Sequence, residues 1–300
     1  MNLNNLKDEF LLDLTEYSAC AESTKDGYNF DLTNFIEYLH KLSISESNQL
    51  SINLIENYLR ELKNKKTYSR LAPTTKARIR SSIKSFLVYL YRQDYIKTNL
   101  GAKLKKIKIP LKDPEYLSRE QYSHFIKTIE REATPYYRER DLALVKLLIK
   151  SGLRRAEVVS LNTLDIDLSK LMLKVKRKGN KEEYVYIHHE LADDLNRYLK
   201  IIESDKDRPL FLSKRGNRLS ASSVWHLIKM YSHKSGLNGD VTVHSLRHTF
   251  ATILLSENVP LPTIQRLMGH RSPTTTFRYL HLTNPEVAEQ FNRVNFEERR

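Results

Sequence analysis

Residues 243–255 read VHSLRHTFATILL, and their pattern decides how this part of the chain folds. The apolar residues follow the spacing i, i+4, i+7 and i+8, which places them on one face of a helix: Leu246, Phe250, Ile253 and Leu254. His244 and Arg247 lie one turn apart at the start of this helix. Both side chains can therefore point at one anion, in a place where the backbone N–H groups and the helix dipole also favour negative charge.

An upstream segment places a second arginine at a helix start. Asp141 is expected to cap a helix over residues 142–150, and Gly152 is expected to end it. Arg154 then lies near the start of the next helix, and Glu157 follows three residues later on the same face. By itself this arginine–glutamate pair is typical of a surface ion pair.

The remaining part of the C-terminal half predicts a hairpin and a short helix. Residues 171–175 and 184–188 alternate between apolar and polar, and the segment KGNK at 178–181 between them predicts a turn. A helix over residues 263–268 is expected to end at Gly269, so that His270 falls on the following loop. Tyr279 comes nine residues later.

The first hundred residues have a helical period throughout. Two sets of apolar residues each occupy one helix face: Tyr28, Leu32, Phe35, Ile36 and Leu39, and then Ile79, Ile83, Phe86, Leu87 and Leu90. Together with helices over 10–14 and 52–62, they predict a four-helix domain over residues 1–100.

A basic linker is expected after this domain. Residues 101–116 contain two prolines and five lysines and have no apolar helix face. Residues 117–300 then form a second domain, which is mainly helical with a small antiparallel sheet and ends in a tail over residues 283–300. The predicted fold class is mainly α, of the α+β type.

The net charge of the chain is strongly positive and unevenly distributed. Fifty Lys and Arg residues against 36 Asp and Glu residues give a formal charge of +14. Residues 1–50 carry 3 basic and 9 acidic side chains, whereas residues 51–110 carry 15 basic and 3 acidic ones. This concentration of positive charge favours a polyanionic partner such as nucleic acid.

Three features indicate a cytoplasmic protein without a membrane partner. Cys20 is the single cysteine, so no internal disulfide can form. The opening residues MNLNNLKDEF lack the basic and apolar regions of a secretory signal. The best apolar run, residues 142–149, contains Lys146 and is too short to cross a membrane.

The helix whose apolar face runs from Ile79 to Leu90 also carries a basic stripe. Lys76, Arg80 and Lys84 recur every four residues beside the apolar face, after the helix start Pro73-Thr74-Thr75. Such a stripe can bind DNA phosphates while the apolar face packs in its own domain. The alternative is an ordinary solvated helix face.

Five strings of sequence, in this order and spacing, resemble the tyrosine recombinases, the phage-integrase and Xer-like group. They are SGLRRAEVVSL, RKGNKEEYVYI, HSLRHTFATILL, LMGH and a tyrosine, Tyr279, nine residues after the histidine of LMGH. The N-terminal helices look like the core-binding, SAM-like domain of that family, so the resemblance covers nearly the whole chain. This chain departs from the family pattern at Asn99-Leu100, where relatives often have Asn-Pro, and at Arg155, a second basic residue after Arg154.

The resemblance implies a site-specific DNA recombinase that needs no metal and no cofactor. Tyr279 attacks a DNA phosphate and forms a 3′-phosphotyrosine and a free 5′-hydroxyl group. Arg154 and Arg247 hold the phosphate, because planar guanidinium groups can bind two of its oxygens and stabilise the transition state.

Three further residues receive roles from the same resemblance, and the spacing of Glu157 from Arg154 makes it a supporting residue. His244 acts as the general base for Tyr279 or donates a hydrogen bond to the phosphate, and His270 donates a further one. Lys178 is the candidate acid for the leaving 5′-oxygen, and Glu157 supports the site by holding a neighbouring donor.

The implied partners are double-stranded DNA core sites and other recombinase protomers. Two sites would be joined by a homotetramer, or by a hetero-tetramer with a related recombinase, and exchange would pass through a Holliday junction. The tail over residues 283–300 would pack on the neighbouring protomer, and an accessory protein is also compatible with the family. The expected biological roles are the resolution of chromosome dimers, plasmids or cointegrates and the integration of a mobile element. The expected location is the cytoplasm, in association with the nucleoid.

Two interpretations from other classes also fit parts of the sequence. The pattern of residues 246–268 resembles a helix-turn-helix motif, which is typical of a DNA-binding regulator. An enzyme of the type IB topoisomerase kind would keep the chemistry but relax DNA without exchanging strands. A zinc site at His244 and His248 is not expected, because the H-E-x-x-H pattern is absent and no cysteine is near.

Overall fold

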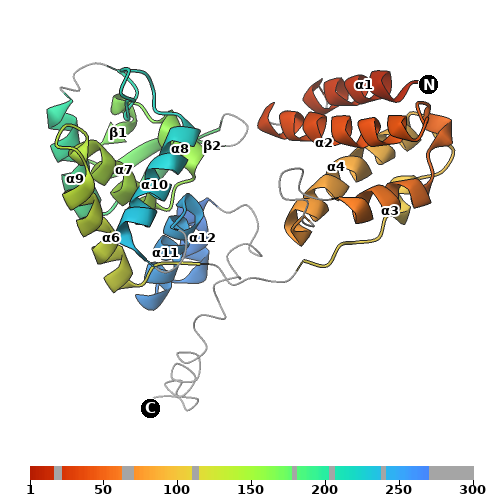
Figure 1. Ribbon diagram of the computed structural model, residues 1–300. Coiled ribbons are helices and arrows are strands. Elements are labelled where there is room, and N and C mark those ends of the chain that lie inside the picture. Colours follow the sequence, from red (N-terminus) through yellow and green to blue (C-terminus); the bar gives the residue numbers. More distant parts are fainter. Residues whose placement is uncertain are drawn as a thin grey trace, which may run out of the picture. The chain divides into compact units, whose positions relative to one another are not determined.

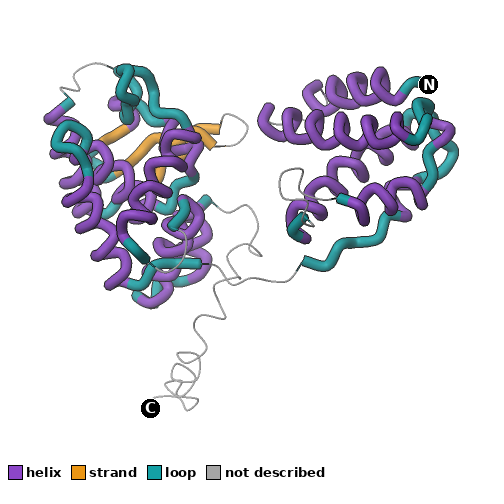
Figure 2. Tube along the Cα trace, viewed as in Figure 1, coloured by secondary structure: helices purple, strands orange, loops and turns teal. Residues whose placement is uncertain are grey.

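The computed structural model describes residues 1–16, 22–62, 71–109, 115–177, 181–202, 207–237 and 241–269. The chain divides into two compact units, Met1–Leu111 and Lys112–Arg300 (Figure 1). Helices make up most of both units, and the strands of the described residues all lie in the second one (Figure 2). The predicted fold class is therefore confirmed. Among the described residues, no helix is both long and apolar enough to cross a membrane.

The first unit is built from helices that bury the predicted apolar faces. Its elements are α1 (Leu3–Glu16), α2 (Glu22–Lys41), η1 (Ser47–Gln49), α3 (Ile52–Glu61), α4 (Pro73–Arg92) and α5 (Leu100–Lys103). Pro73 occupies the first turn of α4, where its missing N–H costs nothing. One core joins the helices and includes Leu32, Phe35, Ile36 and Leu39 of α2 and Ile79, Ile83, Phe86, Leu87 and Leu90 of α4.

Residues 101–105, which the sequence assigns to the linker, pack in the first unit. The Asn99 side chain accepts a hydrogen bond from the Ala102 N–H at 2.9 Å and so begins α5, which continues into the expected linker. Gly101 lies so close to α4 that a Cβ atom there would come within 2.9 Å of the Lys84 carbonyl oxygen. Leu104 is buried in the core of this unit. This small helix therefore extends the first unit beyond residue 100.

The second unit surrounds one central helix. Its elements are α6 (Arg119–Glu132), α7 (Arg138–Ser151), α8 (Arg155–Ser160), η2 (Thr163–Asp165), β1 (Ile166–Asp167), β2 (Met172–Arg177), β3 (Lys181–Tyr186), α9 (His189–Ile201), α10 (Ala221–Ser235), α11 (Val243–Ser256) and α12 (Leu261–Met268). Helix α7 packs against α6, α8, α9 and α11. Its apolar run from Leu142 to Ile149 is buried apart from Lys146, which explains why this run is the most apolar of the chain.

The three strands form an antiparallel sheet in the order β1-β2-β3. Leu173 of β2 pairs with Ile166 of β1 and with Val185 of β3, and Arg177 pairs with Lys181 at the end of the hairpin. The hairpin agrees with the alternation in the sequence. Strand β1 was not predicted, because two residues are too few to show a period of two.

The start of α7 differs from the sequence prediction. This helix begins at Arg138, and Asp141 does not cap it. The Asp141 carboxylate is buried, and it accepts hydrogen bonds from the Tyr231 hydroxyl at 2.7 Å and from Arg140 Nη2 at 2.7 Å. The Asp141 carboxylate is therefore needed to pair with buried hydrogen-bond donors, and it does not mark the start of the helix.

Candidate active site

The turn between α7 and α8 carries the first arginine of the candidate site. Helix α7 ends at Gly152, whose φ of +61° is strained for other residues. A Cβ atom at Gly152 would lie 2.3 Å from Cδ1 of Phe250, so a glycine is also needed for α11 to pack here. Arg154 is the N-cap of α8, as the sequence predicts, and its side chain is 45% exposed.

Glu157 is a buried carboxylate that holds Arg154 at two points. Its Oε2 accepts the backbone N–H of Arg154 at 2.7 Å, and its Oε1 accepts Nη1 of the same residue at 2.8 Å. Burial opposes ionisation of Glu157, but the backbone N–H of Arg154 and the charges of Arg177 and Arg154 outweigh it and lower its pKa. Glu157 is therefore an anchoring anion in the protein interior, unlike the surface partner that the isolated pair suggests.

The second arginine comes from the first turn of α11. The Thr242 side chain caps this helix by accepting the Ser245 N–H at 3.0 Å, which fixes the turn that carries His244 and Arg247. Arg247 is 6% exposed. Its Nη1 donates to the Gly152 carbonyl, and its Nη2 donates to the Met268 carbonyl at 2.6 Å.

The two arginines meet at the C-terminal end of α12. Gly269 ends this helix in a left-handed conformation, with a φ of +60°. Arg154 Nη2 donates to the Gly269 carbonyl at 3.3 Å, next to the Met268 carbonyl that binds Arg247. The fold thus brings together Arg154, Glu157 and Arg247 from two helices that are distant in sequence. Guanidinium groups held side by side can bind one oxyanion.

His244 shares the electropositive surroundings of these arginines. Desolvation of the ring, followed by the nearby charges of Arg247, Arg155 and Arg154, lowers its pKa below the usual 6.5. The imidazole is therefore neutral at pH 7, which is the form that can accept a proton.

The sequence prediction missed Arg177, which lies directly beside Glu157. Arg177 Nη1 donates to Oε1 of Glu157 at 3.0 Å, and the side chain is 7% exposed. The signal was present in the strand pattern, because Arg177 follows Leu173 and Val175 at the period of two that defines the buried face of β2.

Three of the predicted site residues lie outside the described residues: Lys178, His270 and Tyr279. Their roles stay predictions, as does that of the tail over residues 283–300. Lys178 directly follows Arg177 in the chain, and His270 directly follows Gly269.

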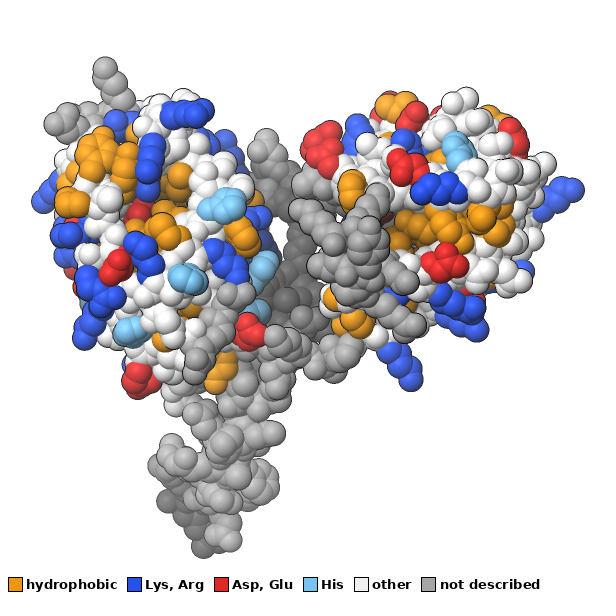
Figure 3. Space-filling view, viewed as in Figure 1, with side chains coloured by type: hydrophobic (Ala, Val, Ile, Leu, Met, Phe, Trp, Pro, Cys, Tyr) orange, Lys and Arg blue, Asp and Glu red, His pale blue; other side chains and the backbone are white. Residues whose placement is uncertain are grey.

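The basic stripe of the first unit lies along α4. Lys84 is exposed, whereas Lys76 and Arg80 are half-buried. Arg80 is also tied to the chain, because its guanidinium group donates to the carbonyls of Leu104 and Lys105. Lys and Arg side chains are spread over the visible face of each unit, with acidic side chains among them (Figure 3).

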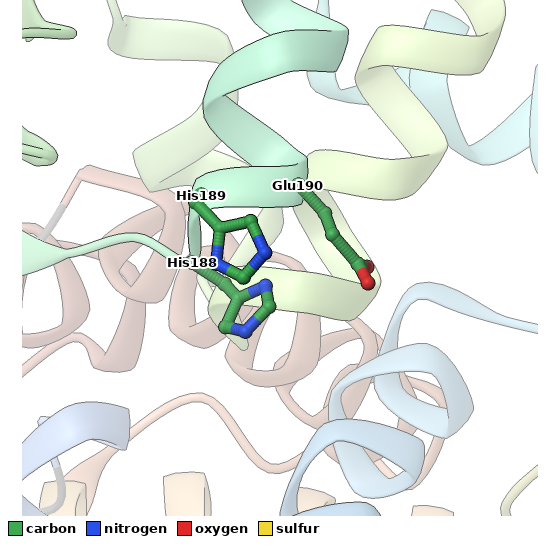
Figure 4. Close-up of side chains that lie close together, drawn as sticks. All are labelled: His188, His189 and Glu190. Carbon is green, nitrogen blue, oxygen red and sulfur yellow. The ribbon is translucent and has the colours of Figure 1, made fainter.

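A cluster of potential metal ligands, the only one found among the described residues, lies at the start of α9. Ligand atoms of His188, His189 and Glu190 are within 4.8 Å of one another, and all three residues are exposed (Figure 4). Glu190 already forms an ion pair with Lys150 at 3.0 Å. The carboxylate of this cluster is therefore already balanced by a lysine.

Comparisons with known proteins match both units of the chain. The family model of the phage integrase family matches residues 115–286, and that of the phage integrase N-terminal SAM-like domain matches residues 8–94. The tyrosine recombinase XerC of Caldanaerobacter subterraneus subsp. tengcongensis is 32% identical over 310 residues, which cover 95% of this chain and 85% of that protein. The tyrosine recombinase XerD of Lacticaseibacillus casei is 29% identical, over 98% of this chain and 99% of that protein.

Solved structures show the same fold. The crystal structure of XerA recombinase is 26% identical, covers 98% of this chain and 99% of its own, and has a TM-score of 0.53. A XerH recombinase bound to its palindromic difH substrate after cleavage is 22% identical, with coverages of 90% and 79% and a TM-score of 0.70. A lambda integrase tetramer bound to a Holliday junction is 18% identical, with coverages of 93% and 77% and a TM-score of 0.73.

Proposed function

The chain belongs to the phage integrase family of tyrosine recombinases, which cleave and rejoin DNA at specific sites, and we propose that its arginine site holds the scissile phosphate. The observation that carries this proposal is the meeting of Arg154 and Arg247 at the end of α12, with Glu157 anchoring Arg154. Two guanidinium groups can bind the nonbridging oxygens and stabilise the added negative charge of the pentacoordinate transition state.

The chemical steps are assigned to the residues around this phosphate. Tyr279 attacks the phosphorus and forms a 3′-phosphotyrosine, and neutral His244 accepts the proton of its hydroxyl group. Lys178 donates a proton to the leaving 5′-oxygen, and His270 donates a hydrogen bond to the phosphate. The phosphotyrosine conserves the energy of the phosphodiester, so the reverse attack by a 5′-hydroxyl group rejoins DNA.

The role of His244 gives a prediction for the pH dependence of cleavage. The lowered pKa keeps His244 neutral to a lower pH than an ordinary histidine, so we expect the acid limb of single-turnover cleavage to have its midpoint below 6.5. Arg155→Gln removes one of the charges that lower this pKa, so the midpoint should move upward. The measurement is the cleavage rate from about pH 5 to about pH 8. An acid limb that Arg155→Gln leaves in place would contradict the assignment of His244 as the base.

The protein acts on double-stranded DNA, and we infer that four protomers join two core sites. A relative of the same fold forms a tetramer on a Holliday junction, which supports this assembly. The protomers are either copies of this chain or this chain with a related recombinase, and an accessory protein is compatible with both. We further propose a cytoplasmic role at the nucleoid, such as chromosome resolution, for this member of the tyrosine recombinases.

We propose that the stripe on α4 binds the DNA backbone. Lys84→Ala and Lys76→Ala should each weaken DNA binding and reduce the slope of log K against log salt by about 0.9, the value for one phosphate contact. Arg80→Ala should weaken binding further than either, because Arg80 also holds residues 104–105 against the first unit. Lys41, at the end of α2, is an exposed lysine that is not part of the stripe, so Lys41→Ala serves as the control for the loss of one positive charge. Unchanged slopes in the stripe variants would show that the stripe is an ordinary solvated helix face and does not bind DNA.

One experiment separates recombination from the two alternative activities. The purified protein is incubated with a nicked suicide duplex and, separately, with a plasmid that carries two copies of the DNA site recovered from the bound and cleaved DNA. A recombinase forms a covalent adduct and exchanges the two sites. A regulator forms no adduct, and a relaxing enzyme forms the adduct and removes supercoils but leaves the two sites unexchanged.

A further inference from the structure

The last residue of β2 is an arginine that points into the second unit. Leu173, Val175 and Arg177 occupy the buried positions of this strand, and the side chain of Arg177 is 7% exposed. Burying a guanidinium group is strongly destabilising unless its N–H groups are paired. The partners of Arg177 therefore show which parts of the fold depend on it.

Those partners lie on three different elements. Arg177 Nη1 donates to Oε1 of Glu157 on α8 at 3.0 Å and lies 3.5 Å from the Met268 carbonyl oxygen at the end of α12. Its Nε donates to Oε2 of Glu183 on β3 at 3.2 Å. One side chain thus connects the hairpin to α8, which follows Arg154, and to the end of α12, where both arginines of the site are anchored.

The backbone of Gly269 is shaped around this guanidinium group. A Cβ atom at Gly269 would lie 2.4 Å from Cζ of Arg177, so any side chain at position 269 would displace Arg177. Gly269 also has the positive φ that disfavours other residues. The end of α12 and the guanidinium plane of Arg177 therefore fit each other as one packed unit.

Arg177 and Arg154 share one carboxylate oxygen. Oε1 of Glu157 accepts Nη1 of Arg177 at 3.0 Å and Nη1 of Arg154 at 2.8 Å. Arg177 binds this carboxylate from the buried side, and the half-exposed Arg154 binds it from the solvent side. Without Arg177 the carboxylate would keep its bonds to Arg154 but lose its tie to the end of α12.

Arg247 depends on the same end of α12. The Met268 carbonyl oxygen accepts Arg247 Nη2 at 2.6 Å and lies 3.5 Å from Arg177 Nη1. A shift of Met268 and Gly269 would therefore move the anchor of Arg247 as well as the Gly269 carbonyl that Arg154 contacts. Arg177 connects the Met268 carbonyl to Glu157, and its guanidinium group packs against Gly269, which carries the other carbonyl.

We propose that Arg177 is a positioning residue for the phosphate-binding arginines. Its guanidinium group holds Glu157 and the end of α12 in one arrangement, and that arrangement sets where Arg154 and Arg247 meet the phosphate. The guanidinium charge of Arg177 is paired with two carboxylates, those of Glu157 and Glu183, so we assign Arg177 to positioning and not to contact with the phosphate. The inference rests on the proposed function, in which Arg154 and Arg247 hold the scissile phosphate.

The test compares variants on three suicide substrates. The first substrate has an ordinary scissile phosphate, the second has a methylphosphonate in which one nonbridging oxygen is replaced by a methyl group, and the third has sulfur at the bridging 5′ position. The methylphosphonate is neutral, so it needs less stabilisation by guanidinium groups. The sulfur substrate needs no acid, because a thiolate is a good leaving group. The variants are Arg177→Met, Arg177→Lys and, as a reference for the phosphate-binding role, Arg154→Ala.

We expect Arg177→Met to cleave the ordinary substrate about 100-fold more slowly than wild type, the loss that misplacement by an ångström can cause. The ratio of wild-type to variant rates should fall toward one on the methylphosphonate, as it should for Arg154→Ala, and should stay high on the sulfur substrate. Arg177→Lys keeps the charge but not the planar fork, so its loss should be smaller and should follow the same pattern.

Arg140 provides a matched control, because it is a largely buried arginine of the same unit, with 11% of its side chain exposed, and is paired with Asp141. Arg140→Met should lower the midpoint of thermal unfolding and leave cleavage at the wild-type rate.

The inference is overturned if Arg177→Met cleaves like wild type, if its loss of rate is undiminished on the methylphosphonate, or if only the sulfur substrate relieves that loss. If Arg177→Met does not fold, Arg177→Lys decides by the same comparison. If Arg154→Ala is not relieved on the methylphosphonate, the proposed phosphate site itself is wrong.

Discussion

Tyr279→Phe is expected to abolish the covalent protein–DNA adduct and to leave DNA binding unchanged. In the proposed mechanism the phenolic oxygen attacks the phosphorus, and this substitution removes that oxygen alone. Arg154 and Arg247 still hold the phosphate, so affinity is kept. Loss of the nucleophile in an enzyme with a covalent intermediate costs roughly 10⁶-fold in turnover, which places adduct formation below detection. The measurement is a denaturing gel with an end-labelled suicide duplex, together with a binding assay on the same DNA.

A second tyrosine provides the matched control. Tyr184 lies on β3, and 66% of its surface is exposed. Among the described residues, the structure shows no hydrogen bond between Tyr184 and the arginine site. Tyr184→Phe should therefore form the adduct at the wild-type rate. An adduct formed by Tyr279→Phe would remove Tyr279 from the mechanism, and its identification by peptide mapping would name the true nucleophile.

The sequence predicted the helices and the hairpin because their signals are local. The faces of α2 and α4 are set by spacings of three and four residues, and the buried residues of both helices follow them. Gly152 and Gly269 end α7 and α12 as expected, since only a residue without a Cβ atom adopts the left-handed conformation easily. In both cases the structure adds a second reason, which is the close approach of another side chain.

The site was predictable in its residues but not in its connections. The spacing of His244 and Arg247 placed both on the first turn of one helix, which is a local property. The bonds that join Arg154 to Gly269 and Arg247 to Met268 depend on how α8, α11 and α12 pack, and no periodicity contains that information. The prediction for Asp141 was wrong for a related reason. A polar residue before an apolar run can cap a helix or can accept a hydrogen bond from a residue distant in sequence, as Asp141 does from Tyr231.

Arg247→Ala is expected to slow cleavage by about 10³-fold or more, the range for an arginine that stabilises a phosphoryl transition state. The substitution removes the group that binds the phosphate, and it also leaves the carbonyl oxygens of Gly152 and Met268 without this donor. The first effect is chemical and the second is structural, so both must be measured. The cleavage rate is taken on the ordinary suicide duplex and on the methylphosphonate, and stability is taken from thermal unfolding.

The two effects can be separated because they respond differently to the charge of the substrate. Lost transition-state stabilisation is relieved when the scissile phosphate is neutral, whereas a general loss of folded protein slows the cleavage of every substrate. We therefore expect most of the loss in Arg247→Ala to disappear on the methylphosphonate. Arg140→Ala, which also removes a buried arginine with a carbonyl partner, should lower stability without slowing cleavage. If Arg247→Ala and Arg140→Ala slow cleavage equally, or if the loss in Arg247→Ala is the same on both substrates, Arg247 contributes to the fold alone and the phosphate is held by other groups.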